Sequence, residues 1–227
     1  MTLLLSRLEK TNPKMLFRFF IVGLAACAAF GSGQVQAQNP RVQIPFELHD
    51  KSLKLTEWAK QPMLLNPVAL SFDYQGRLFV VETARRGTVD IDIRAHKEWV
   101  IDDLSNQNIP QLRKMFRSKM APELSEQNKS WLQDRNQDGS HDWRDLMAVK
   151  ERIHLLQDTD DDGKADVAKV FAEGFNQEVN GVMAGVLPYR GDVFATIYPD
   201  VWKLNDSDHD GYADKQEVFI HGFGVHA

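Results

Sequence analysis

The chain contains one cysteine in 227 residues, Cys27. A single thiol cannot form an intramolecular disulfide, so the loops must be held by packing or by bound ions. Basic residues are not in excess either, because 27 Lys and Arg face 32 Asp and Glu and give a formal net charge of −5. No basic stripe is present, and we therefore expect no nucleic-acid partner.

Long apolar runs are scarce, and the one near the N-terminus is short. It covers residues 19–30, follows four basic residues and precedes a small-residue cleavage site, Val35-Gln36-Ala37. This pattern predicts a secretory signal peptide over residues 1–37 and a periplasmic or secreted protein. Removing that segment changes the net charge from −5 to −8. A second interpretation makes Cys27 a lipoprotein processing site and hence a lipid anchor; we favour the cleavage at Ala37.

Three aspartate loops stand out in the remaining sequence. They read DRNQDGSHD at 134–142, DTDDDGKAD at 158–166 and DSDHDGYAD at 206–214, and each fits D-x-[DN]-x-D-G-x-x-D. Oxygen ligands at alternate positions converge when the chain curls around an ion, and the glycine permits that curl. We therefore predict structural calcium sites at these loops, with the ligands Asp134, Asn136, Asp138, Asp142, Asp158, Asp160, Asp162, Asp166, Asp206, Asp208, Asp210 and Asp214.

EF-hands are the main alternative for these loops. An EF-hand requires a helix on each side and an acidic residue at loop position twelve. That position holds Asp145 in the first loop, Lys169 in the second and Glu217 in the third, and the flanks of the second loop resemble strands. The EF-hand fold is therefore rejected, although the ion chemistry is the same.

The second and third loops lie in a longer repeat with an offset of 48 residues, counted from Asp158 to Asp206. Such a period, with several short strands per unit, is typical of propeller blades. We predict an all-β fold, a β-propeller represented by about two four-stranded blades of a probable six. After a lead-in segment at 38–65, a partial propeller covers 66–227, with its first blade at 66–175 and its second at 181–223.

The strands of the predicted blades are short apolar runs separated by turns. We place them at 68–72, 77–81, 182–187, 193–198, 201–204 and 217–220, and around the loop at 158–166. An insertion at 83–150 interrupts the first blade and contains the first aspartate loop. Within it, Leu112, Met115, Phe116 and Met120 have helical spacing after Pro110, which predicts a short helix that packs on the blade.

The order of these segments resembles that of a bacterial family, the membrane-bound dehydrogenase-like proteins. The resemblance runs through residues 66–69, 80–83, 92–104, 152–166 and 174–176, and continues through 198–202 to 222–226. Members are similar to quinoprotein glucose and sorbosone dehydrogenases, and many carry a cytochrome c domain. The resemblance implies an N-terminal part of a six-bladed dehydrogenase that oxidises a sugar or an alcohol.

In such enzymes pyrroloquinoline quinone is the cofactor, and haem c in a further domain, or a separate cytochrome c, accepts the electrons. The resemblance places the catalytic histidine and the quinone-binding residues beyond Ala227, so we assign no catalytic residue and expect the fragment alone to be inactive. Two alternatives stay open. One is a non-enzymatic calcium-binding interaction module, and the other is a propeller lactonase or hydrolase, for which Glu82 is the visible candidate ligand.

Three further side chains are candidates for the chemistry of the full protein. His226 lies beside the predicted start of a further blade, and Arg94 and His96 lie in the insertion. For each we prefer an ordinary structural role, because none belongs to a motif with a specific mechanism. Trp202 and Phe79 occupy strand positions and are expected in the core.

Overall fold

The computed structural model describes residues 2–8, 18–21, 49–50 and 52–224. Contacts divide the chain into two compact units, one of residues 1–65 with 162–164 and one of residues 66–161 with 165–227. The first unit contains a three-stranded antiparallel sheet in the order β2-β1-β3, formed by β1 (Thr2–Leu8), β2 (Arg18–Ile21) and β3 (Leu53–Lys60). Strand β3 lies in the segment for which the sequence predicted only a lead-in.

Most of the predicted signal peptide lies outside the described residues. This holds for residues 22–37, and therefore for Cys27 and the cleavage site at Ala37. Strands β1 and β2 fall within the same predicted segment. Among the described residues, no helix has both the length and the apolar character needed to cross a bilayer.

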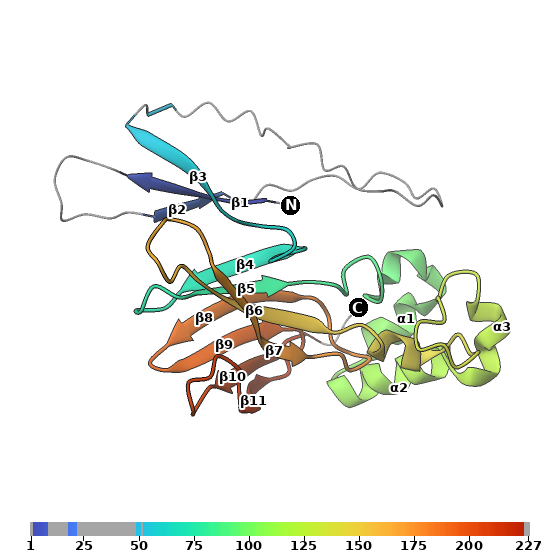
Figure 1. The fold of residues 1–227 in the computed structure, drawn as a ribbon. Helices are drawn as coiled ribbons and strands as arrows, with labels where there is room; N and C mark the ends of the chain where they lie inside the picture. Colours follow the sequence, from blue (N-terminus) through green and yellow to red (C-terminus); the bar gives the residue numbers. More distant parts are fainter. Residues whose placement is uncertain (1, 9–17, 22–48, 51, 225–227) are drawn as a thin grey trace. The chain divides into compact units, whose positions relative to one another are not determined.

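Two four-stranded antiparallel sheets form the second unit (Figure 1). The first has the order β4-β5-β6-β7 and consists of β4 (Pro67–Phe72), β5 (Leu78–Glu82), β6 (Glu151–Gln157) and β7 (Val167–Gly174). The second consists of β8 (Met183–Tyr189), β9 (Asp192–Ile197), β10 (Asp200–Asn205) and β11 (Lys215–His221), again paired in chain order. The predicted β class and the positions of the eight strands are confirmed. These eight strands form two open sheets and do not close a propeller.

The two sheets repeat each other in detail. Leu78 pairs with Leu156 in the first sheet, and Val193 pairs with Leu204 at the same place in the second. A register shift between Ile153 and His154 recurs between Val201 and Trp202, and the shift between Pro67 and Ala69 recurs between Met183 and Gly185. Because a bulge changes the direction of a strand, its recurrence makes the two sheets curve in the same way.

One apolar core joins the two sheets face to face. It contains Phe79, Val81, Ile153, Leu155 and Phe171 from the first sheet, and Met183, Val193, Ala195, Ile197 and Leu204 from the second. These residues alternate along their strands with residues of the opposite face, as the period of two requires. Phe79 is therefore a core residue as predicted, and Trp202 packs against the same core while half-buried.

The insertion occupies residues 83–150, as predicted, between β5 and β6. It is composed of short helices: η1 (Ile93–Ala95), η2 (Lys97–Trp99), α1 (Val100–Ser105), α2 (Ile109–Lys119), η3 (Pro122–Leu124), α3 (Ser125–Asn128) and η4 (Trp143–Met147). Asn108 caps α2 by accepting a hydrogen bond from the Gln111 amide, and Pro110 occupies the first turn, where a missing N–H is tolerated.

The predicted helix face is buried, but its surroundings differ from the expectation. Leu112, Met115, Phe116 and Met120 belong to a second core, formed mainly by the insertion with Trp99, Leu132 and Leu146. The β-rich part contributes Val179 and the partly buried Tyr198. The insertion therefore has its own apolar core instead of lying flat on the first sheet.

A buried pair of opposite charges fixes the base of the insertion. Arg85 is fully buried, and its guanidinium donates hydrogen bonds to the carbonyls of Leu146 at 2.6 Å, Val149 at 2.9 Å and Asn180 at 2.9 Å. Glu151, also fully buried, accepts hydrogen bonds from the backbone amides of Ala84, Arg85 and Met183. Burial lowers the pKa of Arg85, and the nearby Glu151 carboxylate opposes that shift.

We expect Arg85→Met to lower the free energy of unfolding by about 3 kcal/mol or more, because it leaves several buried carbonyls without their donor. Urea denaturation followed by circular dichroism measures the change. Arg86→Met is the matched control, since Arg86 is the exposed neighbour, and should change stability by less than about 0.5 kcal/mol. Equal effects of the two substitutions would contradict the role assigned to Arg85.

Candidate metal centre

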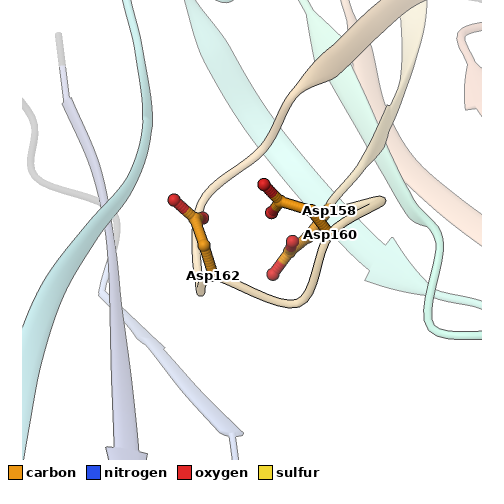
Figure 2. Close-up of side chains that lie close together, drawn as sticks. All are labelled: Asp158, Asp160 and Asp162. Atoms are coloured by element: carbon orange, nitrogen blue, oxygen red, sulfur yellow. The ribbon is translucent and has the colours of Figure 1, made fainter.

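Two aspartate triads lie in corresponding loops of the two sheets. Asp158, Asp160 and Asp162 lie in the loop between β6 and β7, where Figure 2 shows their carboxylates close together. The triad of Asp206, Asp208 and Asp210 lies in the loop between β10 and β11. In each triad one oxygen per residue lies within 4.8 Å of the others. The structure therefore brings together positions one, three and five of the second and third predicted loops.

The backbone of the loops explains this convergence. Position four has a positive φ in all three loops, with 61° at Gln137, 60° at Asp161 and 62° at His209. The glycine at position six follows with 85° at Gly139, 86° at Gly163 and 89° at Gly211. Two left-handed residues so close together reverse the chain tightly, and the glycine accepts its conformation without the Cβ penalty. The predicted role of these glycines is confirmed.

Hydrogen bonds inside the third loop hold the carboxylates of its triad in place. Asp206 Oδ2 accepts a hydrogen bond from the Gly211 amide at 3.0 Å, and Asp210 Oδ1 accepts one from the Tyr212 amide at 2.7 Å. In the second loop the Lys164 amide donates in the same way to Asp162 at 2.8 Å. Asp206, Asp210 and Asp162 thus accept hydrogen bonds from amides of their own loop, which fixes the orientation of these carboxylates.

The fourth predicted ligand of each of these loops has a different role. Asp214 Oδ2 accepts hydrogen bonds from the amide of Ser207 at 2.8 Å and from its hydroxyl at 2.7 Å. Asp166 makes the same two bonds with Thr159, at 2.7 and 2.9 Å. These bonds lower the pKa of both carboxyls below the ordinary value, so the carboxylates stay charged. Asp166 and Asp214 thus tie the last position of each loop to its second position, a junction that we call the neck of the loop. Neither residue belongs to a triad.

The hydroxyl at position two is a signal that sequence reasoning missed. Thr159 and Ser207 both occupy that position, and each is bonded by the acid seven residues later. The first loop has Arg135 there, and its neck is closed by another residue. Asp145 Oδ1 accepts a hydrogen bond from the Arg135 amide at 2.7 Å and thus replaces the position-nine aspartate.

The first loop shares the curl of the other two, but its third position holds Asn136 instead of an aspartate. Asp134 Oδ2 accepts a hydrogen bond from the Gly139 amide at 3.0 Å, the same bond that Asp206 makes. Asp142 turns away to cap η4 and pairs with Arg144 at 2.5 Å, an interaction that lowers its pKa to about 2. Asn136 and Asp138 bond to each other at 3.1 Å. Of the four predicted ligands, Asp142 is thereby engaged elsewhere.

The triads could hold a divalent cation such as calcium. Two oxygens bound to one calcium ion at 2.3–2.6 Å can lie at most about 5 Å apart, and the observed spacing meets that limit. Three carboxylates at this distance repel each other, and a divalent cation between them removes the repulsion. Asp208, Asp210 and Asp160 are exposed, so an ion can enter from solvent. The oxygens come from one short loop, which suits a site that braces a hairpin.

The other candidate side chains are engaged in local contacts. Glu82 is buried and lies 2.9 Å from His154 Nε2, across the neighbouring strand. His96 stacks on Trp99 with ring centroids 4.1 Å apart and also contacts Trp131. Arg94 pairs with Asp92 at 2.5 Å on the surface. His226 lies outside the described residues. The structural roles preferred for Arg94 and His96 agree with these contacts.

We expect Asp208→Asn to remove calcium binding at the third loop, because it replaces a charged ligand of the triad by a neutral one. Isothermal titration calorimetry should show one bound ion fewer per chain. Glu217→Gln is the matched control: it removes the same charge from β11, outside the triad, where Glu217 pairs with Lys215 at 2.9 Å. Loss of an ion with Glu217→Gln would favour the EF-hand type of ligation instead.

Comparison with known proteins gives a family but no activity. Searches of curated proteins and of solved structures found no match to this chain. The family described as "Domain of unknown function (DUF7133)" matches residues 46–227, which include both four-stranded sheets, the insertion and all three aspartate loops. The chain belongs to this DUF7133 family.

Proposed function

We propose that this chain is a calcium-braced scaffold made of two consecutive blades of a β-propeller. The observation that carries the proposal is the recurrence of one aspartate triad at the same loop of two sheets with the same strand order. The repeated register shifts support it further, because successive blades of a propeller have the same shape. In this role the ions are structural, and they hold the hairpins β6–β7 and β10–β11 closed.

The strand topology places the two aspartate triads at one end of the sheets and the helical insertion at the other end. In an up-and-down sheet, alternate connections lie at opposite ends of the strands. The two triads and the turns after β4 and β8 therefore share one end, while the insertion and the connections after β7 and β9 share the other (Figure 1). A brace at one end leaves the other end available for a substrate site.

For the complete protein we propose a quinoprotein-type dehydrogenase that acts on a sugar or an alcohol, on the basis of the sequence resemblance. We assign no quinone site to the described residues. Arg85, Arg113 and Arg117 are occupied by backbone carbonyls or by Glu178, at 3.1 Å for Arg113 and 2.7 Å for Arg117. The role we propose for this chain in such an enzyme is that of a scaffold.

Calcium should raise the melting temperature of the chain, because an ion that binds only the folded state stabilises it in proportion to the logarithm of its concentration. At a free calcium concentration of about 100 times the dissociation constant, each site contributes about 2.7 kcal/mol. Differential scanning calorimetry with calcium, and then with excess EDTA, measures the shift.

Magnesium is the control for this measurement. It prefers six ligands in a small octahedron and loses its water reluctantly, so it should stabilise the chain less than calcium does. The double variant Asp160→Asn with Asp208→Asn should abolish most of the calcium effect. If the melting temperature stays the same in calcium and in EDTA, the proposed brace does not exist.

A further inference from the structure

A cavity of about 430 Å³ lies between the insertion and the second sheet. Sites for small organic molecules in proteins have volumes of about 300–1,000 Å³, so the size is suitable for such a ligand. The insertion contributes residues 89–91 and two residues of α2, and the connection between β7 and β8 contributes residues 178–182. The second sheet contributes Ala184, Thr196 and Tyr198. Three segments that are distant in sequence therefore build the cavity.

Ion pairs and hydrogen bonds hold the connection between β7 and β8 against the other two walls. Glu178 attaches the connection to α2, because it pairs with Arg113 at 3.1 Å and with Arg117 at 2.7 Å. The Gly181 amide attaches the connection to β9 by donating a hydrogen bond to the Tyr198 carbonyl at 3.0 Å. A ligand would therefore enter a preformed cavity and would order few groups on binding.

Asp90 brings a carboxylate to the wall of this cavity. The Arg85 carbonyl holds the turn that precedes Asp90, since it accepts hydrogen bonds from the amides of Thr88 at 2.9 Å and Val89 at 3.0 Å. The Gly87 amide donates a hydrogen bond to Asp90 Oδ1 at 2.6 Å and fixes the side chain. Among the described residues, Asp90 forms no ion pair. A carboxylate can accept more than one hydrogen bond, so Asp90 can also receive a donor from a ligand.

The charges around the cavity favour a cation inside it. The lining includes the carboxylates of Asp90 and Glu178, and none of the described residues that line it is basic. The charge of Glu178 is compensated by its two arginines. Glu151 and Asp90 both raise the pKa of the buried Arg85, and Glu151 does so more strongly. Arg85 therefore offsets the charge of Asp90 only in part, and a positive group beside Asp90 gains electrostatic energy.

The rest of the lining favours an organic cation over a metal ion. Most of it is aliphatic or aromatic, with Leu112, Phe116, Val179 and Tyr198 among its members. A metal ion of the size of calcium needs six to eight oxygen ligands, which such a wall does not offer. An ammonium group on an apolar body suits the cavity better. Aromatic rings attract the ammonium group, and the apolar body gains from leaving water.

We propose that this cavity binds a small organic amine, with the ammonium group at Asp90 and the apolar part between α2 and β9. This site goes beyond the scaffold role proposed above and needs neither calcium nor a quinone. The cavity lies at the end of the sheets that carries the insertion, whereas the aspartate triads lie at the other end.

Three probes test the charge of the ligand. Phenethylamine, phenethyl alcohol and hydrocinnamate share a phenylethyl group and differ in the charge at its end. Isothermal titration calorimetry of the full chain, in saturating calcium, measures the affinity of each. The amine should bind about tenfold or more tightly than the alcohol, because only the amine offers a charged donor to Asp90 and a cation to the aromatic rings. Hydrocinnamate should bind most weakly, since its carboxylate would lie beside that of Asp90.

Substitutions locate the binding site. Asp90→Asn should reduce the affinity for phenethylamine to about that for the alcohol and leave the alcohol unchanged, because the amide is neutral. Glu123→Gln is the matched control: it removes one negative charge from an exposed position of the insertion outside the lining, and should change neither affinity. Ala184→Phe fills part of the cavity and should weaken both probes about tenfold or more. Thermal melts followed by circular dichroism show whether each variant folds.

Equal affinities for the amine and the alcohol would overturn the proposal, as would tighter binding of hydrocinnamate. Failure of all three probes to bind would also overturn it. Amine binding that is unaffected by Asp90→Asn or by Ala184→Phe would place the amine elsewhere on the chain and contradict the assigned site. A missing effect of calcium on the melting temperature would contradict the calcium brace and leave the result with the amine intact.

Discussion

The buried pair of Arg85 and Glu151 holds together the parts of the β-rich unit. Glu151 begins β6, and its carboxylate binds the amides of Ala84 and Arg85, at the start of the insertion, and the amide of Met183, at the start of β8. Arg85 in turn binds the carbonyl of Val149, at the end of the insertion, and that of Asn180, before β8. Two charged side chains thus fix three segments that are distant in sequence. Buried charges are retained only when their hydrogen-bonding groups are largely satisfied, and these two are densely bonded.

Different interactions hold the two ends of the sheets. At one end, the buried pair closes the insertion and connects the first sheet to the second. At the other end, the loops between β6 and β7 and between β10 and β11 carry concentrated negative charge close to solvent. The chain has no disulfide to hold such loops, so the carboxylates of Asp166 and Asp214 hold them by hydrogen bonds, and a cation bound by the triads would add to that stability. One end is thus held by the buried hydrogen bonds of Arg85 and Glu151, and the other by carboxylates in loops close to solvent.

The repeat itself has a structural consequence. The two sheets have equivalent register shifts and equivalent aromatic pairs, Phe79 with Phe171 and Phe194 with Phe219, and they pack with unlike faces together. The surroundings of the two pairs differ, because Phe219 remains exposed where Phe171 is buried. Architecture and exposed surface therefore have the same origin in the 48-residue period.

The sequence by itself determined the local features. Alternating apolar residues and turns predicted the eight strands of the two sheets, and the boundaries of the insertion at 83–150 agree with the structure. The glycines of the aspartate loops predicted the curl, since a left-handed residue is required there. The helix at Leu112 and Phe116 was predictable from its period of 3.6.

Only the tertiary structure decided which of these groups meet. Within the loops, the curl of the backbone selects partners that identical spacing left open: Asp142 pairs with Arg144, Asp145 bonds to the Arg135 amide, and Asp166 and Asp214 bond to position two of their loops. Nothing in the local pattern marked Arg85 and Glu151 as a pair, because their partners come from segments up to 95 residues away. Local conformation depends on neighbours in the chain, whereas hydrogen-bond partners and burial depend on which distant segments the fold brings together.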